Sequence, residues 1–250
     1  MKNTLKEKLK KGQAVIGTFV GLGHPDVTEM LSKLGFDWLV IDGEHSPIGF
    51  ETIQKMMQPM DAGKCTPVVR PQWNDMVVIK RVLDIGAYGV LVPWVNTKED
   101  AEYAVRACRY PPAGLRGVGP RRAALSDPSY FETANDELLI IPQIETAKAL
   151  SNLDGIFSAE GIDACFVGPW DLSFDMGFGP PRWDNPAFVE AFDKVLNAAR
   201  KSGKPAGMYC TQDNIEWAIE KGFKINTVDN ADAFLMRSAR LALKKARGPR

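Results

Sequence analysis

Eight short apolar runs alternate with longer amphipathic stretches along this chain, and that alternation restricts its fold more than any other feature of the sequence. Most runs are rich in β-branched residues and lack a strict alternation of apolar and polar positions, which is typical of parallel strands buried on both faces. The predicted strands are Val15–Val20, Trp38–Ile41, Pro67–Val69, Gly89–Pro93, Leu138–Ile144, Ala164–Val167, Ala206–Cys210 and Phe223–Val228.

The stretches between these strands carry the residue spacing of helices, and capping residues mark several of their ends. Thr97 with Asp100 forms a capping sequence at one start, and Gly203 and Gly222 follow two of the ends. The predicted helices are Pro25–Leu34, Phe50–Ala62, Met76–Ile85, Thr97–Cys108, Pro186–Ser202, Asp213–Lys221 and Ala231–Lys245.

Eight strand–helix alternations within 250 residues predict one α/β domain, residues 1–250, folded as a (β/α)8 TIM barrel. A doubly wound open sheet is the alternative. That fold predicts a Gly-x-Gly-x-x-Gly turn, and the segment 17–23 lacks this order of glycines. The Pro- and Gly-rich segment 110–120 is expected to be a loop between the fourth and fifth strands, and loops of this length are often functional.

Charge and cysteine content exclude several kinds of partner. Lys and Arg together number 31, as do Asp and Glu, so the formal charge of zero exerts no long-range attraction on nucleic acid or anionic lipid. The segment 1–11 is polar, and no stretch approaches the ~18 uncharged apolar residues that cross a bilayer. The 4 cysteines lie far apart, without a Cys-x-x-Cys pair. We therefore expect a cytoplasmic protein with reduced thiols that binds neither nucleic acid nor a membrane.

Acidic side chains follow two adjacent strands, at the end where a barrel of this type carries its chemistry. Glu145 and Asp171 hold these positions, and two neighbouring carboxylates repel each other unless a cation neutralises them. Oxygen ligands suit Mg2+, Mn2+ or Co2+ better than zinc, so we predict that the two residues bind a divalent metal ion. The alternative is that each only caps a following helix.

Two basic groups converge on the same mouth of the barrel. His45 ends an Asp-Gly-Glu-His stretch, and nearby carboxylates keep an imidazole basic, which favours proton transfer over a structural role. Arg70 follows the third strand, and its planar fork suits a carboxylate or an enolate oxygen. The alternative for Arg70 is an ion pair with Glu44 or Asp42.

Two further observations concern the substrate and the mechanism. Gly168 and Pro169 would let backbone N–H groups near Trp170 and Asp171 approach a substrate carboxylate. A Schiff-base enzyme needs a lysine at the carboxyl end of a strand, and no lysine of this sequence holds such a position. A metal ion is therefore the expected electron sink.

The segments that carry these residues resemble the HpcH/HpaI family of class II, metal-dependent pyruvate aldolases. That family includes 4-hydroxy-2-oxoheptanedioate, 2-dehydro-3-deoxyglucarate and 2-keto-3-deoxy-rhamnonate aldolases. The resembling segments follow the family order along nearly the whole chain, and the Asp-Gly-Glu-His block is specific. They are residues 35–47, 69–71, 83–86, 91–93, 109–119, 143–145 and 167–173.

The resemblance implies a ligand set and a substrate contact surface. Glu145 and Asp171 would ligate the divalent metal ion, and Gln143 would lie beside the bound 2-oxoacid.

The resemblance also implies catalytic roles. Arg70 would contact the keto oxygen and stabilise the enolate. His45 would act as acid and base through a metal-bound water. Asp42 would orient that imidazole, or else Asp84, which a neighbouring subunit can supply.

For the whole molecule, the resemblance implies a barrel whose last helix, Ala231–Lys245, swaps between protomers of a homohexamer assembled as a trimer of dimers. The implied reaction is the reversible cleavage of a 4-hydroxy-2-oxoacid to pyruvate, or a related 2-oxoacid, and an aldehyde through a metal-stabilised enolate. Decarboxylation of oxaloacetate through the same enolate is one alternative. A barrel that only binds a 2-oxoacid is the other.

Several residues depart from the family pattern. Trp94 and Trp170 replace residues that are commonly Met and small, respectively, and Phe19 occupies a position often held by Trp. We expect these residues to resize the aldehyde side of the site. We also expect Arg121 or Arg122 to bind a carboxylate of the acceptor, the alternative being a solvated basic pair.

Overall fold

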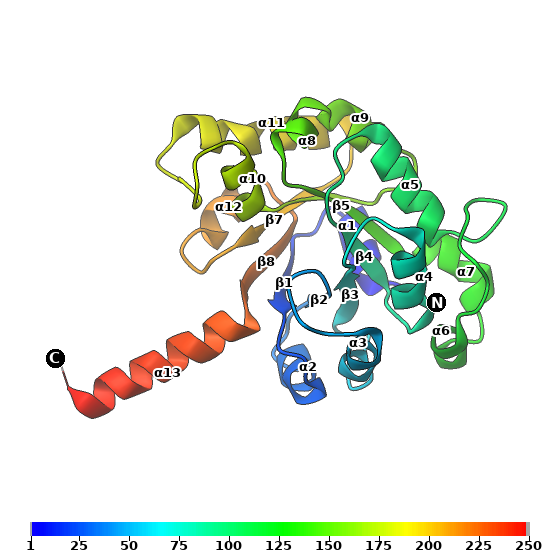
Figure 1. Ribbon diagram of the computed structural model, residues 1–250, viewed down its shortest axis with the longest axis horizontal. Coiled ribbons are helices and arrows are strands. Elements are labelled where there is room, and N and C mark those ends of the chain that lie inside the picture. The colour runs from blue at the N-terminus through cyan, green and yellow to red at the C-terminus, as the bar shows by residue number, and fades with distance from the viewer. Residues whose placement is uncertain (1, 249–250) are drawn as a thin grey trace.

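The computed structural model describes residues 2–248, and its eight parallel strands close into a barrel in sequence order. Figure 1 shows these strands at the centre of the molecule with helices around them. The closed order confirms the predicted (β/α)8 fold and excludes the doubly wound sheet. The strands are β1 (Val15–Val20), β2 (Trp38–Asp42), β3 (Thr66–Arg70), β4 (Gly89–Val92), β5 (Leu139–Ile144), β6 (Cys165–Val167), β7 (Ala206–Cys210) and β8 (Ile225–Asn230).

The structure contains the seven predicted helices and also several short ones that the residue spacing did not indicate. These additional helices have five to eight residues each, too short for a periodic apolar pattern to stand out. The helices are α1 (Thr4–Lys10), α2 (Pro25–Ser32), α3 (Phe50–Met57), α4 (Met76–Asp84), α5 (Lys98–Cys108), α6 (Arg121–Ser126), α7 (Tyr130–Glu137), α8 (Ala147–Ser151), α9 (Leu153–Ser158), α10 (Pro169–Asp175), α11 (Pro186–Ser202), α12 (Ile215–Lys221) and α13 (Ala231–Arg247).

Helix α1 packs at the amino end of the barrel, where the strands begin. Its buried Leu5 and Leu9 join the apolar core that fills the inside of the barrel. The Nζ atom of the buried Lys6 lies 2.9 Å from a carboxylate oxygen of Asp163 and donates to the carbonyl of Leu138 at 3.0 Å. Because α1 covers this end, the functional cavity is expected at the opposite, carboxyl end of the strands.

The predicted loop 110–120 lies between α5 and α6, with the backbone N–H of Leu115 donating to the carbonyl of Arg106 at 2.7 Å. It buries Arg116 completely, and the guanidinium donates to Asp84 at 2.7 Å. Asp84 is the last residue of α4, so both groups lie at the amino end of the barrel. The loop therefore does not line the mouth where the catalytic chemistry was expected.

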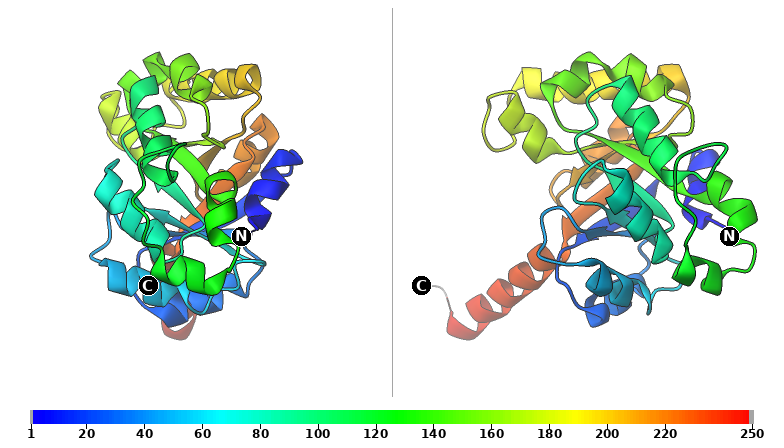
Figure 2. Two further views of the ribbon diagram at one scale, coloured as in Figure 1. Left: turned by 90° about the vertical axis from the view of Figure 1, so that its right-hand side faces the viewer. Right: turned by 45° about the vertical axis from the view of Figure 1, so that its right-hand side comes forward.

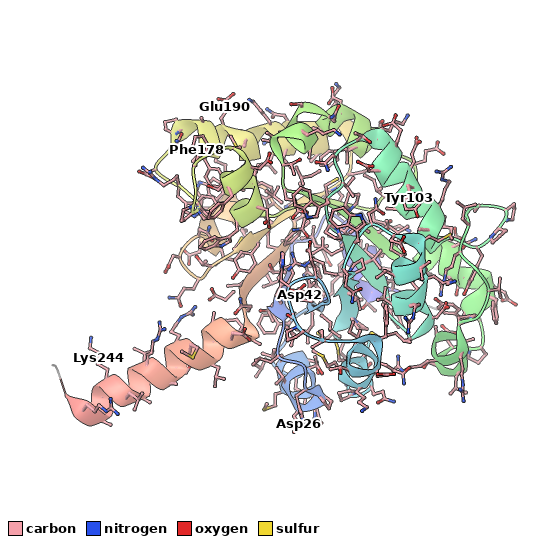
Figure 3. All side chains as sticks on the ribbon, viewed as in Figure 1. Asp26, Asp42, Tyr103, Phe178, Glu190 and Lys244 are labelled. Carbon is pink, nitrogen blue, oxygen red and sulfur yellow. The ribbon has the colours of Figure 1, made fainter. Side chains whose placement is uncertain are left out.

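Helix α13 extends away from the barrel after its first turns, as Figures 1 and 2 show from three directions. Figure 3 places Lys244 on this extension, far from the strands. The helix carries large apolar side chains that are half exposed or more, among them Leu235 at 60% and Leu241 at 56%. Within residues 2–248, no helix is both long and apolar enough to span a membrane.

Candidate active site

A cavity of about 380 Å³ opens at the carboxyl end of the strands. Figure 3 shows Asp42, one of its lining residues, near the centre of the ring of strands. The cavity is lined by Phe19, Gly21, Asp42, His45, Ser46, Arg70, Gln143, Phe166, Gly168, Pro169, Trp170, Asp171, Tyr209, Asn230 and Asp232. Most of the predicted site residues therefore meet in one place, as expected for groups at the ends of parallel strands.

Arg70 is held in the cavity wall by two carboxylates. Its Nε and Nη2 atoms donate to the two oxygens of Asp42 at 2.9 and 2.7 Å, and Nη1 lies 3.1 Å from an oxygen of Glu44. The guanidinium also lies over the ring of Phe19, 4.9 Å from its centroid. The ion pairs considered as the alternative role for Arg70 are thus both present. Two of the five N–H groups of this arginine donate to Asp42, while the contact with Glu44 is an ion pair without a hydrogen bond, so N–H groups remain for a ligand.

Asp42 fixes the backbone that carries His45 rather than the imidazole itself. Its Oδ1 accepts from the backbone N–H of Glu44 at 3.1 Å and of His45 at 3.3 Å. Burial alone would raise the pKa of Asp42, but the hydrogen bonds and charge of Arg70 hold it below its usual value. The exposed imidazole lies nearest to Glu44, with 3.7 Å between Nε2 and a carboxylate oxygen. In this structure Asp42 therefore positions His45 through the backbone N–H, and its role in orienting the imidazole stays a prediction.

Glu145 is almost completely buried at the end of β5. One of its oxygens accepts from the backbone N–H of Trp94 at 2.7 Å, and the other accepts from the side-chain amide of Gln143. Trp94 has a left-handed backbone with φ of 57°, a strained conformation that directs its N–H toward the carboxylate. Thr146 provides the cap of the next helix, which excludes the capping role for Glu145.

Gly168 and Asp171 lie at the start of α10, beside Glu145. A Cβ atom at Gly168 would approach an oxygen of Glu145 to 3.0 Å and the amide nitrogen of Gln143 to 2.8 Å, so only glycine fits there without displacing them. Asp171 and the half-exposed Trp170 face the cavity from the first turn of that helix. This close packing brings the ends of β5 and β6 together, as predicted.

The carboxylates around Arg70 carry more negative charge than its guanidinium can neutralise. Burial raises the pKa of Glu145 to about 7, and the charges of Glu44 and Asp171 add to this effect. Burial, opposed by Arg70 and reinforced by Asp42 and Asp171, likewise raises the pKa of Glu44 to about 7. A cation at this place would relieve the repulsion and stabilise the ionised forms.

The donor set also fits a hard divalent cation. Gln143 has a buried side-chain oxygen without a hydrogen-bond donor, next to the two carboxylates. Over residues 2–248, no group of three or more His, Cys, Asp or Glu side chains is arranged to hold a metal ion. Two protein carboxylates would leave coordination positions for water and substrate, as in other sites with Mg2+. The assignment of Glu145 and Asp171 as ligands remains a prediction.

Three predicted residues lie elsewhere in this chain. Asp84 pairs with Arg116 at the amino end of the barrel, so only a neighbouring subunit could bring an Asp84 to this cavity. Arg122 donates to the carbonyl of Ile85 at 2.8 Å, and Arg121 lines a separate groove with Asp84. Neither arginine lines the cavity of its own chain, because α6 packs beside the end of α4, and their expected role in binding an acceptor carboxylate stays a prediction.

The structure also shows residues that the sequence reasoning left out or named only as an alternative. Glu44 was named only as an alternative ion-pair partner of Arg70; it contacts Arg70 behind the cavity lining, and its place between Asp42 and His45 was a usable signal. Tyr209 is the fourth residue of β7, while Asn230 and Asp232 flank the junction of β8 and α13. The sequence pattern around Tyr209, Asn230 and Asp232 indicated a site only weakly, because these strand ends are less polar and no loop separates β8 from α13.

Comparison with known proteins decides the family. The sequence profile of the HpcH/HpaI aldolase/citrate lyase family matches residues 15–233. The chain belongs to this family. The 4-hydroxy-2-oxo-heptane-1,7-dioate aldolase of Escherichia coli is 43% identical over 220 residues, which cover 86% of this chain and 83% of that protein.

Two further comparisons agree with this assignment to the HpcH/HpaI family. The enzyme of the same name from Salmonella arizonae is 45% identical over 213 residues, covering 83% of this chain and 80% of its own. The crystal structure of a family member from Burkholderia cenocepacia superposes with a TM-score of 0.94 at 32% identity, over 99% of this chain and 100% of that one. The chain is accordingly an enzyme, an aldolase of this family, and the resemblance noted from its motifs is confirmed.

Proposed function

We propose that this aldolase cleaves a 4-hydroxy-2-oxoacid to pyruvate and an aldehyde, and catalyses the reverse addition, in the cavity around Arg70. The observation that carries the proposal is the placement of a buried guanidinium between carboxylates at the same mouth as Glu145 and Asp171. The names of the relatives from Escherichia coli and Salmonella arizonae support a substrate of this class.

Glu145 and Asp171 would hold the divalent metal ion, for which we propose Mg2+, Mn2+ or Co2+. When bound, the ion supplies Lewis-acid polarisation of the 2-oxoacid. The protein supports this arrangement through the fixed orientation of Glu145, whose two oxygens already have N–H donors from Trp94 and Gln143. Such outer contacts typically matter 10–100-fold for metal affinity or activity.

Arg70 would stabilise the negative charge that develops on the keto oxygen as the C3–C4 bond breaks. In cleavage, the C4 hydroxyl loses its proton, the electrons of the C3–C4 bond move toward C3, and C4 leaves as the aldehyde carbonyl. A proton then adds to C3 and gives pyruvate. Arg70 is pre-organised for this role because Asp42 fixes its plane, so little reorganisation is needed during the reaction.

His45 would take and return these protons. Its imidazole is exposed to the cavity, its backbone is fixed by Asp42, and the carboxylate of Glu44 lies 3.7 Å away. Histidine is the side chain that most often transfers protons as a general acid and base, so its position at the cavity supports this role.

We also propose that the enzyme is a homo-oligomer, a trimer of dimers, in which α13 packs on a partner subunit. The exposed apolar side chains of that extended helix support this proposal. A cytoplasmic location is supported by the four cysteines, which are all unpaired and buried within the described part of the chain.

The exchange of the C3 protons of pyruvate with deuterium tests the proposed function without an aldehyde. We expect exchange that stops with EDTA and returns with Mn2+, and its loss in Glu145→Gln and Asp171→Asn. Glu190→Gln, on the exposed surface of α11, is the matched control and should exchange like wild type. Normal exchange in either of the first two variants would refute the ligand assignment, and oxaloacetate decarboxylation without aldol cleavage would refute the aldol reaction.

A further inference from the structure

Two tryptophans meet at the carboxyl end of the barrel, on the segments that follow β3 and β4. The indole rings of Trp73 and Trp94 lie with their centroids 5.9 Å apart and their planes inclined by 30°. Trp94 is also the residue whose backbone N–H donates to Glu145 at 2.7 Å. A ring contact and a hydrogen bond to a proposed metal ligand are thus made by the same residue.

The backbone of Trp94 has a conformation that tryptophan rarely adopts. Its φ of 57° lies in the left-handed region. For a residue other than glycine, this region is disfavoured by a factor of about five to thirty relative to the right-handed region. A residue remains in such a conformation only where the surrounding structure holds it.

Relaxation of Trp94 would move the N–H group that Glu145 accepts from. A peptide unit is planar, so it turns as one body about the line between its two flanking Cα atoms. If φ of Trp94 became negative while β4 stayed in place, the unit between Pro93 and Trp94 would turn and carry the N–H away from the carboxylate. The same rotation would tilt the Cα–Cβ bond of Trp94 and move its indole away from Trp73. The left-handed backbone, the hydrogen bond and the ring contact are therefore linked.

Asp100, in the first turn of α5, connects the segments that carry the two tryptophans. Its carbonyl accepts from the side-chain amide of Asn74, the neighbour of Trp73, at 3.0 Å. Its carboxylate accepts from the backbone N–H of Asn96 at 3.0 Å, and the side-chain amide of Asn96 donates to the carbonyl of Trp94 at 3.0 Å. All these contacts lie within one chain, so each subunit makes them by itself.

We propose, on the basis of the proposed function in which Glu145 is a metal ligand, that Trp73 and Trp94 are positioning residues for metal binding. Their ring contact keeps Trp94 in its left-handed conformation, and the N–H of Trp94 keeps Glu145 in the orientation that holds the ion. Aromatic pairs contribute a factor of about two to twelve to an equilibrium constant. This factor is comparable to the lower end of the preference against a left-handed backbone, so the ring contact can maintain the conformation.

Calorimetric titration of the metal-free, full-length enzyme with Mn2+ tests this role without turnover. Trp73→Ala should raise the Kd for Mn2+ about two- to tenfold, the factor that the ring contact contributes. Trp73→Phe keeps an aromatic ring at this position and should restore most of the affinity.

Phe131→Ala, in α7, is the matched control. Phe131 is 55% exposed against 52% for Trp73, and its ring forms a similar pair with Tyr110, with 6.1 Å between the centroids and an angle of 36°. It is remote from Glu145 in the fold, because α7 precedes the amino end of β5 and Glu145 follows its carboxyl end. The control should bind Mn2+ with the Kd of wild type.

Two substitutions of Trp94 separate positioning from loss of packing. Trp94→Ala and Trp94→Gly both remove the indole, but glycine adopts a positive φ without a steric penalty. The Kd for Mn2+ should therefore be about fivefold higher in Trp94→Ala than in Trp94→Gly. Loss of packing alone would make Trp94→Gly the weaker binder, because glycine leaves the backbone more mobile. Adding Trp73→Ala to Trp94→Gly should change the Kd no further, because the ring partner is already absent.

Glu145→Gln separates failure of this inference from failure of the proposed function. If Glu145→Gln binds Mn2+ like wild type, the ligand assignment in the proposed function is refuted. If Glu145→Gln loses binding but Trp73→Ala keeps the wild-type Kd, or Trp94→Ala binds no more weakly than Trp94→Gly, the tryptophans have no positioning role. Thermal unfolding and sedimentation show whether each variant is folded and assembled. Should Trp73→Ala fail to fold, the comparison of the two Trp94 variants decides.

Discussion

Replacing Gly168 by alanine is the sharpest steric test of the site. The added Cβ atom would lie 2.8 Å from the amide nitrogen of Gln143, 3.0 Å from an oxygen of Glu145 and 3.2 Å from the Cβ of Glu145. The backbone of Gly168 has φ of −92° and ψ of 93°, which alanine adopts as readily. The effect of Gly168→Ala is therefore steric, and it falls on the orientation of Glu145.

The Glu145 side chain can move away from the new Cβ atom only by weakening its other contacts. A shift away from Gly168 stretches its hydrogen bond to the N–H of Trp94, now 2.7 Å. Overpacking of this kind costs about 1–3 kcal/mol of stability. Disturbed outer contacts of a metal ligand typically cost 10–100-fold in affinity. We therefore expect the Kd for Mn2+ to rise about 10–100-fold, equivalent to about 1.4–2.8 kcal/mol, with a parallel fall in kcat/KM.

Calorimetric titration with Mn2+ measures this Kd directly, and thermal unfolding confirms that the variant is folded. Gly49→Ala is the matched control, because Gly49 also precedes a helix, has φ of −93°, and would place its Cβ in open space. A folded Gly168→Ala protein with the Kd and kcat/KM of the Gly49→Ala control would refute the reasoning.

Three other perturbations test separate parts of the structure. The pKa of Glu44 is about 7 in the folded protein against 4.5 ordinarily, so the folded state keeps a proton that the unfolded chain loses as pH rises through this window, and the free energy of unfolding falls. In Glu44→Gln the fall in the free energy of unfolding between pH 5 and pH 8 should be about 1–3 kcal/mol smaller than in wild type. Urea unfolding in EDTA measures this difference, and an equal fall in wild type and variant would contradict it. Arg70→Lys keeps the charge but loses the planar fork, and should slow pyruvate C3 exchange about 100-fold; exchange at the wild-type rate would remove Arg70 from the mechanism. Leu241→Asp should reduce the assembled mass in sedimentation while Lys244→Glu leaves it unchanged, and an intact oligomer in Leu241→Asp would show that α13 does not hold subunits together.

The barrel and the convergence of its site could be predicted because both depend on local pattern. The apolar runs place each strand within a few residues, and polar residues at strand ends meet automatically once the strands are parallel. His45, Arg70 and Asp171 reach one cavity for this reason alone. Helix α1 was not predicted, because its two buried leucines lie in a strongly polar sequence. They become buried only by packing against the interior of the barrel.

Side-chain partners could not be predicted from the strand ends. The sequence does not say which neighbour Asp42 contacts; in the structure its carboxylate accepts from Arg70 and from backbone N–H groups. Arg122 looks like a free cation in the sequence, but the turn after α4 brings the carbonyl of Ile85 to it. Such choices depend on packing between elements that are distant in the chain, which residue spacing does not report.

Crystals soaked with Mn2+ and oxalate, examined by anomalous scattering at the manganese edge, test the central claim most directly. Oxalate stands in for the enolate of pyruvate. The account predicts one strong peak within coordination distance of Glu145 and Asp171, with the oxalate facing Arg70. Ordered oxalate in the cavity with no manganese between those two carboxylates would contradict it.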